Sequence, residues 1–159
     1  MTLLNAPEYD EQKERRRHNI LVGSGIFVAV MIVLTVGGFL LGHGWLFTNL
    51  PAEHRMNVFL AAVQAGDYAK AYGIFYNDAN WQQHPEKYKD YPLQRFTEDF
   101  TTESEWGGPI KTFHVDFSRR NATGTVVEAT INGKSNLTMN IQRSDGTLSF
   151  FPYVLTRGL

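Results

Sequence analysis

The longest hydrophobic run in the chain extends from Ile20 to Leu41 and contains no charged residue. Its 22 residues would form a helix about 33 Å long, because an α-helix rises about 1.5 Å per residue. The hydrocarbon core of a bilayer is about 30 Å thick. The pattern therefore predicts a tail over residues 1–19 and a membrane-spanning helix over residues 20–42.

Charged residues on the two sides of this run predict its orientation. Arg15, Arg16 and Arg17 precede it, whereas Arg55 is the only Lys or Arg within fifteen residues after Leu41. Positive charge next to a span stays on the cytoplasmic side. We therefore expect a protein of the inner or plasma membrane with a cytoplasmic amino terminus and an extracytoplasmic carboxyl-terminal domain. The tail has no hydrophobic period and is expected to lack regular structure.

A cleaved signal peptide is the alternative interpretation of this run. The apolar core of a signal peptide is usually about 7–15 residues long and is followed by a small-x-small cleavage site. Here the run is longer, and the best available site is Gly42-His43-Gly44. The pattern favours a permanent anchor.

Small residues recur along the predicted span, and small residues let membrane helices approach closely. The candidate helix-packing face consists of Gly25, Ala29, Gly37, Gly38 and Gly42, and the last two form a GxxxG pattern. Self-association or docking to another membrane protein is one hypothesis that follows. The alternative is that these glycines are unremarkable, because glycine is common in membrane helices.

The apolar positions after residue 50 repeat with the period of a helix. One face carries Met56, Phe59, Leu60 and Val63. Pro51 suits the first turn of a helix, so we expect residues 43–50 to form a connector and a domain to occupy residues 51–159.

A second and a third helix are expected in this domain. Gly66 can end the first helix and Asp67 can cap the next. The second helix has an apolar face of Tyr68, Ala71, Tyr72 and Phe75, and a third, after Pro92, has Leu93, Phe96 and Phe100 on one face. Residues 76–91 lie between them and are rich in Asn, Asp and Pro, which predicts irregular structure.

From residue 113 the hydrophobic period changes to two. Phe113, Val115 and Phe117 alternate with polar residues, which predicts a strand that buries these three side chains. Three more strands are expected over residues 125–131, around Leu137, Met139 and Ile141, and from Leu148 to Phe150 or Tyr153. Asn132-Gly133 is a strong signal for a tight hairpin turn. The pattern predicts an α+β fold, with helices packed on a four-stranded antiparallel meander.

Two segments in this order resemble the nuclear-transport-factor-2-like superfamily. They are the helical hairpin FLAAVQAGDYAKAYGIF (59–75) and the meander TVVEATINGKSNLTMNIQRSDGTLSF (125–150). The resemblance implies a cone, in which a strongly curved sheet wraps around helices and leaves a pocket at its open end. The superfamily includes ketosteroid isomerase-like and dehydratase enzymes, uncharacterised envelope proteins and a scaffold subunit of type IV secretion systems.

Composition excludes several classes of function. The formal net charge is −1 and there is no cysteine, so disulfides, thiolate metal sites and cysteine nucleophiles are excluded. The basic residues of the domain form no concentrated stripe, which argues against a nucleic-acid partner. The five histidines lack the close spacing of metal ligands, and we expect neither a metal nor a cofactor.

The candidate site residues are mostly aromatic. Candidates to line a pocket are Tyr72, Phe75, Trp81, Phe96, Phe100, Phe113 and Phe117. The alternative is that they fill a core for which aromatic side chains supply the bulk. His114 and Asp116 share one face of a strand, where we expect a solvated pair. For an enzyme in the pocket, the further candidates are Tyr72, Tyr76, Glu98 and Asp99, and we assign no catalytic residue.

Three functions remain open on the sequence alone. The favoured one is a single-pass, extracytoplasmic binding or assembly module without catalysis, which binds a protein partner or itself through an exposed sheet face or edge strand. The second is an anchored pocket enzyme or a binder of a small apolar ligand. The third is an accessory subunit of a membrane complex that acts through its transmembrane helix.

Overall fold

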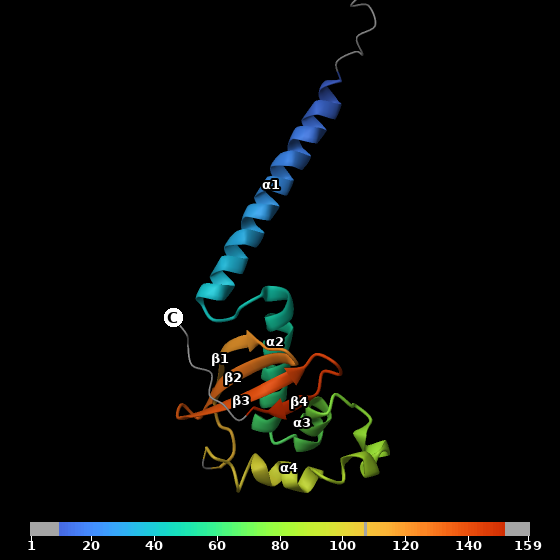
Figure 1. Ribbon diagram of the computed structural model, residues 1–159, viewed down its shortest axis with the longest axis vertical. Coiled ribbons are helices and arrows are strands. Elements are labelled where there is room, and N and C mark those ends of the chain that lie inside the picture. The colour runs from blue at the N-terminus through green and yellow to red at the C-terminus, as the bar shows by residue number, and fades with distance from the viewer. Residues whose placement is uncertain (1–9, 107, 152–159) are drawn as a thin grey trace, which may run out of the picture. The chain divides into compact units, whose positions relative to one another are not determined.

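A computed structural model describes residues 10–106 and 108–151 of the chain. The chain divides into two compact units, Met1–Gly37 and Gly38–Leu159. The described residues of the first unit form most of one long helix, and those of the second form an α+β domain (Figure 1). The two units are described separately.

Helix α1 extends from Glu11 to Leu40. It is long and apolar enough to cross a membrane, by length and composition. Its large side chains are exposed along its length, for example Phe27 at 65% and Val33 at 70%. The helix begins before the apolar run, with Asp10 accepting hydrogen bonds from the amides of Gln12 and Lys13. The expectation that the tail lacks regular structure is therefore wrong from Glu11 onward, because Asp10 caps the helix.

Glycines close the carboxyl-terminal end of α1. Gly42 lies beyond the helix with φ at +87°, and the amides of His43 and Gly44 both donate to the Gly38 carbonyl. A residue with positive φ after the last turn is a common way to satisfy the final carbonyls of a helix. Gly38 and Gly42 therefore do not lie together on one helical face, whereas Gly25, Ala29 and Gly37 are all within α1.

The domain begins with the predicted helical hairpin. Helix α2 runs from Leu46 to Gln64 and α3 from Tyr68 to Phe75. Asp67 caps α3 by accepting from the Lys70 amide, and Gly66 supplies the turn with φ at +75°. The predicted start of α2 at Pro51 is wrong. The Trp45 carbonyl accepts the amides of Thr48 and Asn49, which closes a first turn ahead of the proline.

Short helices connect the hairpin to the sheet. Two 3₁₀ helices, η2 (Trp81–Gln83) and η3 (Pro85–Tyr88), occupy the segment predicted to be irregular. Helix α4 runs from Leu93 to Asp99, after Pro92 as predicted. It packs against α3.

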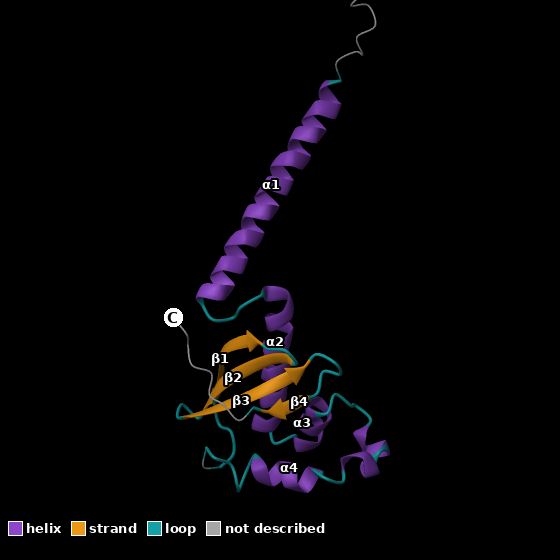
Figure 2. Cartoon of the chain, in the orientation of Figure 1, coloured by secondary structure: helices purple, strands orange, loops and turns teal. Residues whose placement is uncertain are grey.

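Four antiparallel strands complete the domain. They are β1 (Phe113–Arg120), β2 (Gly124–Ile131), β3 (Ser135–Gln142) and β4 (Leu148–Phe150), hydrogen-bonded in the order β1-β2-β3-β4. Asn132 and Gly133 turn the β2–β3 hairpin with φ at +53° and +69°, as their sequence predicts. The α+β fold with a four-stranded meander is confirmed (Figure 2). Tyr153 lies outside the described residues.

A β-bulge at Asp116 changes which side chains of β1 face the helices. Val115 pairs with Ala129, but the next pair is Phe117 with Glu128. The extra residue reverses the alternation, so Ser118 rather than Phe117 pairs with the buried Val127. The prediction that Phe113, Val115 and Phe117 share one face is therefore wrong for Phe117.

The core lies between the sheet and helices α2, α3 and α4. Helix α2 crosses one face of the sheet and contacts β1 and β2 (Figure 1). Phe59, Phe96 and Phe100 are fully buried at its centre, and their rings meet at centroid distances of 4.8 to 6.2 Å. The two contacts of Phe59 are edge-to-face, an arrangement that adds to the free energy of burial.

Candidate functional site

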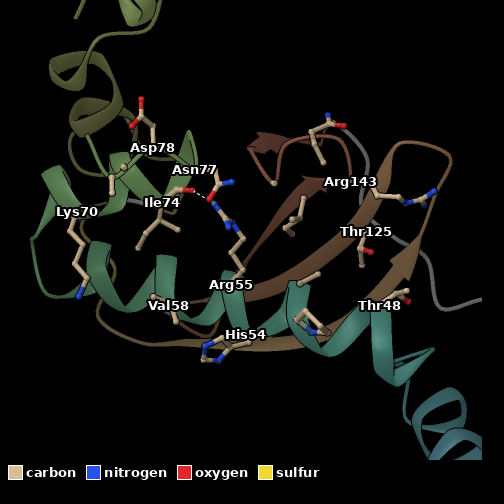
Figure 3. A pocket seen from close by; sticks show the side chains of 18 of the residues that line it. Thr48, His54, Arg55, Val58, Lys70, Ile74, Asn77, Asp78, Thr125 and Arg143 are labelled. Carbon is tan, nitrogen blue, oxygen red and sulfur yellow. Dashed lines mark hydrogen bonds between the residues drawn. The ribbon is translucent and has the colours of Figure 1, made fainter. Parts of the chain in front are cut away.

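The described residues line an open groove beside α2, with a volume of about 980 Å³. One face of α2 forms its floor, α3 with residues 77–81 forms one wall, and the ends of β1, β2 and β3 form the other. Figure 3 shows Arg55 rising from α2 between these walls. Its lining is mostly apolar and includes Ala52, Val58, Ile74, Trp81 and Ile141.

Arg55 ties the two sides of the groove together. Its Nη2 donates to the Ile74 carbonyl and to Asn77 Oδ1, both at 2.8 Å. The side-chain Nδ2 of Asn77 in turn donates to the Asp145 carbonyl at 2.6 Å, in the turn between β3 and β4. Burial lowers the pKa of Arg55, and the Asp145 carboxylate opposes this shift. These groups are bonded to one another, so Arg55 serves as a fixed positive charge in the groove.

The rim of the groove is predominantly basic. Besides Arg55, its ionisable lining residues are His54, Lys70, Asp78, Arg120 and Arg143. Asp78 is the single carboxylate among the described lining residues. A concave surface lined by one sign of charge attracts partners of the opposite sign.

Asp78 belongs to a rigid corner at one end of the groove. Its carboxylate accepts from the Tyr88 hydroxyl at 2.6 Å and from the Asn80 amide at 2.9 Å. These two bonds, the tyrosine first, lower the pKa of Asp78. Trp81 closes the same corner by donating from Nε1 to the Ala69 carbonyl.

The seven aromatic residues predicted as candidate pocket lining are mostly elsewhere. Tyr72, Phe75, Phe96 and Phe100 are buried in the core, with no side chain more than 6% exposed. Phe113 packs against the core at its edge, and Phe117 lies on the opposite face of the sheet. Of the seven, Trp81 alone lines the groove. The aromatic side chains thus fill the space between helices and sheet.

The residues considered as acid or base candidates make hydrogen bonds and ion pairs within the domain. Tyr72 donates to the Tyr91 carbonyl and Tyr91 to Asp99, at 2.6 and 2.7 Å. Burial raises the pKa of Tyr72, Tyr76 and Tyr91, which keeps these phenols neutral at physiological pH. Asp99 also pairs with Arg95 at 3.1 Å, and Glu98 with Arg95 at 3.9 Å.

His114 and Asp116 do not form a pair in the structure. Asp116 accepts from Thr130 Oγ1 across the sheet at 2.7 Å, while His114 is exposed. Among the described residues, no group of three or more His, Cys, Asp or Glu side chains is arranged to hold a metal ion.

A second, smaller cavity of about 480 Å³ lies near α4, between Trp106 and β3. Arg95, Asp99 and Glu103 at its mouth form ion pairs. Phe150 and Phe151 form part of its lining.

A buried polar cluster, which the sequence did not indicate, joins β1 to the start of the domain. Ser118 Oγ donates to Glu53 Oε1 at 2.5 Å, and Asn49 Nδ2 donates to Ser118 Oγ at 2.9 Å. His43 Nδ1 lies 2.9 Å from the same Glu53 oxygen. Here the Glu53 carboxylate lies between the serine and the histidine. In a hydrolase triad the histidine lies between the serine and the carboxylate, so this cluster is not such a triad. Only the bulge in β1 turns Ser118 inward, and no sequence pattern marked that bulge.

Apart from Trp81, the residues that line the groove were not identified from the sequence, although the pattern of α2 contains one signal for them. The apolar stripe Met56, Phe59, Leu60 and Val63 buries one side of α2 and leaves Pro51, Arg55 and Val58 on a neighbouring side.

Comparisons of the chain with protein-family models, with curated proteins and with solved structures find no match.

Proposed function

We propose that this chain is a single-pass membrane protein whose extracytoplasmic domain is a non-catalytic module that binds a protein partner. Helix α1 would be the anchor, since an apolar stretch of its length spans a bilayer. Arg15, Arg16 and Arg17 support a cytoplasmic amino terminus. The exposed apolar side chains of α1 support the same assignment, because such a surface is stable in lipid and costly in water.

We also propose that the domain is of the nuclear-transport-factor-2-like type. The order of a helical hairpin, a short third helix and an antiparallel meander supports this likeness. In this domain, aromatic side chains occupy the space that a cone pocket would use. Their burial favours a binding site on the outside of the domain over a catalytic pocket inside it.

The single observation that carries the proposal is the groove beside α2. Its floor and walls combine apolar side chains such as Val58 and Ile74 with the basic residues Arg55, Lys70 and Arg143. A partner segment with an apolar face and acidic side chains would match both properties. Arg55 Nη2 is bonded to Asn77 and to the Ile74 carbonyl, so we assign the groove shape and charge rather than a reactive group.

Substitution of Val58 tests this assignment of the groove. Val58 is 37% exposed and lines the groove, so Val58→Glu places a negative charge in it. We expect the intact chain, purified from membranes after cross-linking, to retain a partner that Val58→Glu reduces at least about tenfold, which corresponds to about 1.4 kcal/mol.

The matched control is Asn57→Glu. Asn57 is exposed on the same helix but does not line the groove. Equal loss in both variants, or a chain that purifies as a lone monomer in mild detergent, would contradict a partner in the groove.

A small amphipathic ligand is the second candidate for the groove. The volume of about 980 Å³ is within the range of ligand pockets, which is about 300–1,000 Å³. Native mass spectrometry of the intact chain distinguishes the two. A bound small molecule that Val58→Glu displaces, with no cross-linked protein, would favour this candidate.

The third function, assembly through the membrane helix, is tested by replacing it. An unrelated apolar helix in place of residues 20–41 removes Gly25, Ala29 and Gly37. If the partner is retained, the domain makes the contact. If it is lost while the chain remains in the membrane, the span makes it.

A further inference from the structure

The end of the domain where α2 begins carries an exposed surface that combines apolar side chains and arginines. We call it the α2-end surface, and it consists of Trp45, Phe47, Leu50, Arg119 and Arg120, the last of which also lines the edge of the groove. The apolar members are the N-cap residue Trp45 and two residues of the first turns of α2, and the arginines come from the end of β1. These two segments are about seventy residues apart in the sequence, and the fold brings them together.

Exposed apolar side chains are concentrated at this end of the domain. Beyond α1, the large apolar residues that are substantially exposed among the described residues are Leu41, Trp45, Phe47, Leu50, Val58 and Phe150. Four of these six lie between residues 41 and 50. Phe47 is 64% exposed and Trp45 is 44% exposed. The centroids of their rings are 5.8 Å apart. An aromatic cluster of this kind on a surface indicates a contact with a partner or a membrane.

Hydrogen bonds fix the end of β1 beside this cluster. Asn49, in the first turn of α2, donates to both the carbonyl and the hydroxyl of Ser118. Arg119 and Arg120 follow Ser118 directly and are both exposed. Figure 1 shows the end of β1 beside the first turns of α2.

The two arginines make no ion pair with any residue in the described part of the chain. The carboxylate of Glu53, which is bonded to the neighbouring Ser118, is buried and also lies within hydrogen-bond distance of His43. By contrast, Arg95 on α4 pairs with three carboxylates. The arginines at the α2 end are therefore free to bind an external anion.

The chain itself leads from α1 directly to this surface. Helix α1 ends at Leu40, and the Gly42 carbonyl accepts the Ser118 amide at 3.1 Å. Gly42 also packs closely on Phe117, since a Cβ on Gly42 would lie 3.1 Å from the Phe117 Cβ. Two residues after the helix, the chain is thus already joined to the end of β1.

We propose that the α2-end surface lies on the headgroups of the lipid bilayer and prefers anionic phospholipids. This inference rests on the proposed role of α1 as a membrane span. A span that ends at Leu40 delivers residues 42–50 to the bilayer surface. Trp is favoured at that depth, and Phe and Leu side chains of an interfacial surface insert at the headgroup boundary. Each arginine near an anionic surface adds electrostatic attraction. Contact with the bilayer would hold the domain in one orientation, with the α2-end surface facing the lipid.

The test uses the full chain in nanodiscs with a fluorophore on a single introduced cysteine. The chain has no cysteine of its own. Ala122→Cys places the label in the exposed turn that follows Arg120, and Lys134→Cys places it in the exposed turn between β2 and β3, at the other end of the sheet. The quencher is a phosphatidylcholine with a nitroxide on its headgroup. We expect quenching at position 122, and much less at position 134.

The arginine contribution is tested by adding phosphatidylglycerol to the nanodiscs. Quenching at position 122 should increase with phosphatidylglycerol, and Arg119→Gln with Arg120→Gln should remove this dependence. Each arginine should shift the equilibrium between bound and free domain by about fivefold, which corresponds to about 1 kcal/mol. The control with the same loss of charge is Lys111→Gln with Lys134→Gln, which should leave quenching at position 122 unchanged.

Two outcomes would overturn the inference. One is equal, weak quenching at positions 122 and 134 in a chain that is incorporated in the nanodisc. The α2-end surface would then not contact the bilayer, and a protein partner would be its occupant. The other is quenching at 122 that is independent of both phosphatidylglycerol and the arginines. Failure of the proposed anchor is a different result, because the chain would then not enter the nanodisc at all.

Discussion

At the scale of single residues, polar side chains join segments that are distant in sequence. Arg55 and Asn77 connect α2, the end of α3 and the β3–β4 turn. Ser118, Glu53 and Asn49 connect β1 to α2. Removal of one partner from a buried set leaves the other without a hydrogen bond, which costs about 1–3 kcal/mol. These side chains therefore contribute to the shape of the groove and of the α2-end surface.

Asp78 gives the domain a predictable response to acid. Its pKa is lowered in the folded state, chiefly by the Tyr88 hydroxyl. A carboxylate with a lowered pKa stabilises the fold above its ordinary pKa, and this contribution is lost as pH falls through the folded pKa. Below about pH 4, the ordinary range for aspartate, the domain should lose stability.

The substitution Asp78→Asn isolates this effect. We expect the difference in unfolding midpoint between the wild type and Asp78→Asn to be largest near neutral pH and to decrease between pH 5 and about pH 3. Tryptophan fluorescence in a non-ionic detergent follows the unfolding. Exposed Asp90→Asn is the control. If the difference in unfolding midpoint stayed constant with pH, the stability lost in Asp78→Asn would come from altered packing rather than from the missing charge.

The residue scale also shows where prediction from sequence ends. Phe59, Phe96 and Phe100 were identifiable as apolar positions at helical spacing, and the structure buries all three. The partners of Arg55 were not identifiable, because Asn77 is brought beside it only by the turn after α3, where Asn77 takes a positive φ of 52°. Such contacts depend on tertiary structure, which period and propensity do not encode.

At the scale of elements, period and turn chemistry predicted the hairpin and the meander. Gly66 and Asp67 end one helix and begin another, and Asn132-Gly133 turns between two strands, because the local preferences of these residues are strong. The start of α2 and the β1 bulge were not predicted. A turn that precedes Pro51 needs no hydrogen bond from the proline, and a bulge leaves the alternation of Phe113, Val115 and Phe117 intact in the sequence.

Gly124 allows the close pairing of β2 and β3 at the groove. A Cβ at this position would overlap the backbone carbonyl of Ile141 on the neighbouring strand. Because backbone atoms cannot move aside without breaking the ladder, we expect Gly124→Ala to lower the free energy of unfolding by about 3 kcal/mol.

Urea unfolding of the intact chain in detergent measures this loss. Ser144→Ala, in the exposed turn after β3, is the control and should change the midpoint little. An unchanged midpoint for Gly124→Ala would mean that the strands separate at this point without cost, and that the register between Gly124 and Gln142 is not fixed.

At the scale of the whole molecule, the proposed function depends on which side of the membrane the domain occupies. The first unit is a helix of membrane-spanning length and the second is an α+β domain with an open, basic groove. Our proposal places the amino terminus in the cytoplasm and the domain outside. The groove would then meet partners outside the cell or in the periplasm, and the α2-end surface would meet the outer leaflet of the same membrane.

Cysteine labelling in sealed cells or spheroplasts tests this topology most directly, because the native chain has no cysteine. Lys13→Cys reports on the amino-terminal end of α1, and Ser144→Cys reports on an exposed turn of the domain. The account predicts that a membrane-impermeant maleimide labels Ser144→Cys in sealed cells, and labels Lys13→Cys only after the membrane is opened. Labelling of Lys13→Cys in sealed cells, or release of the chain from the membrane by alkaline carbonate, would contradict it.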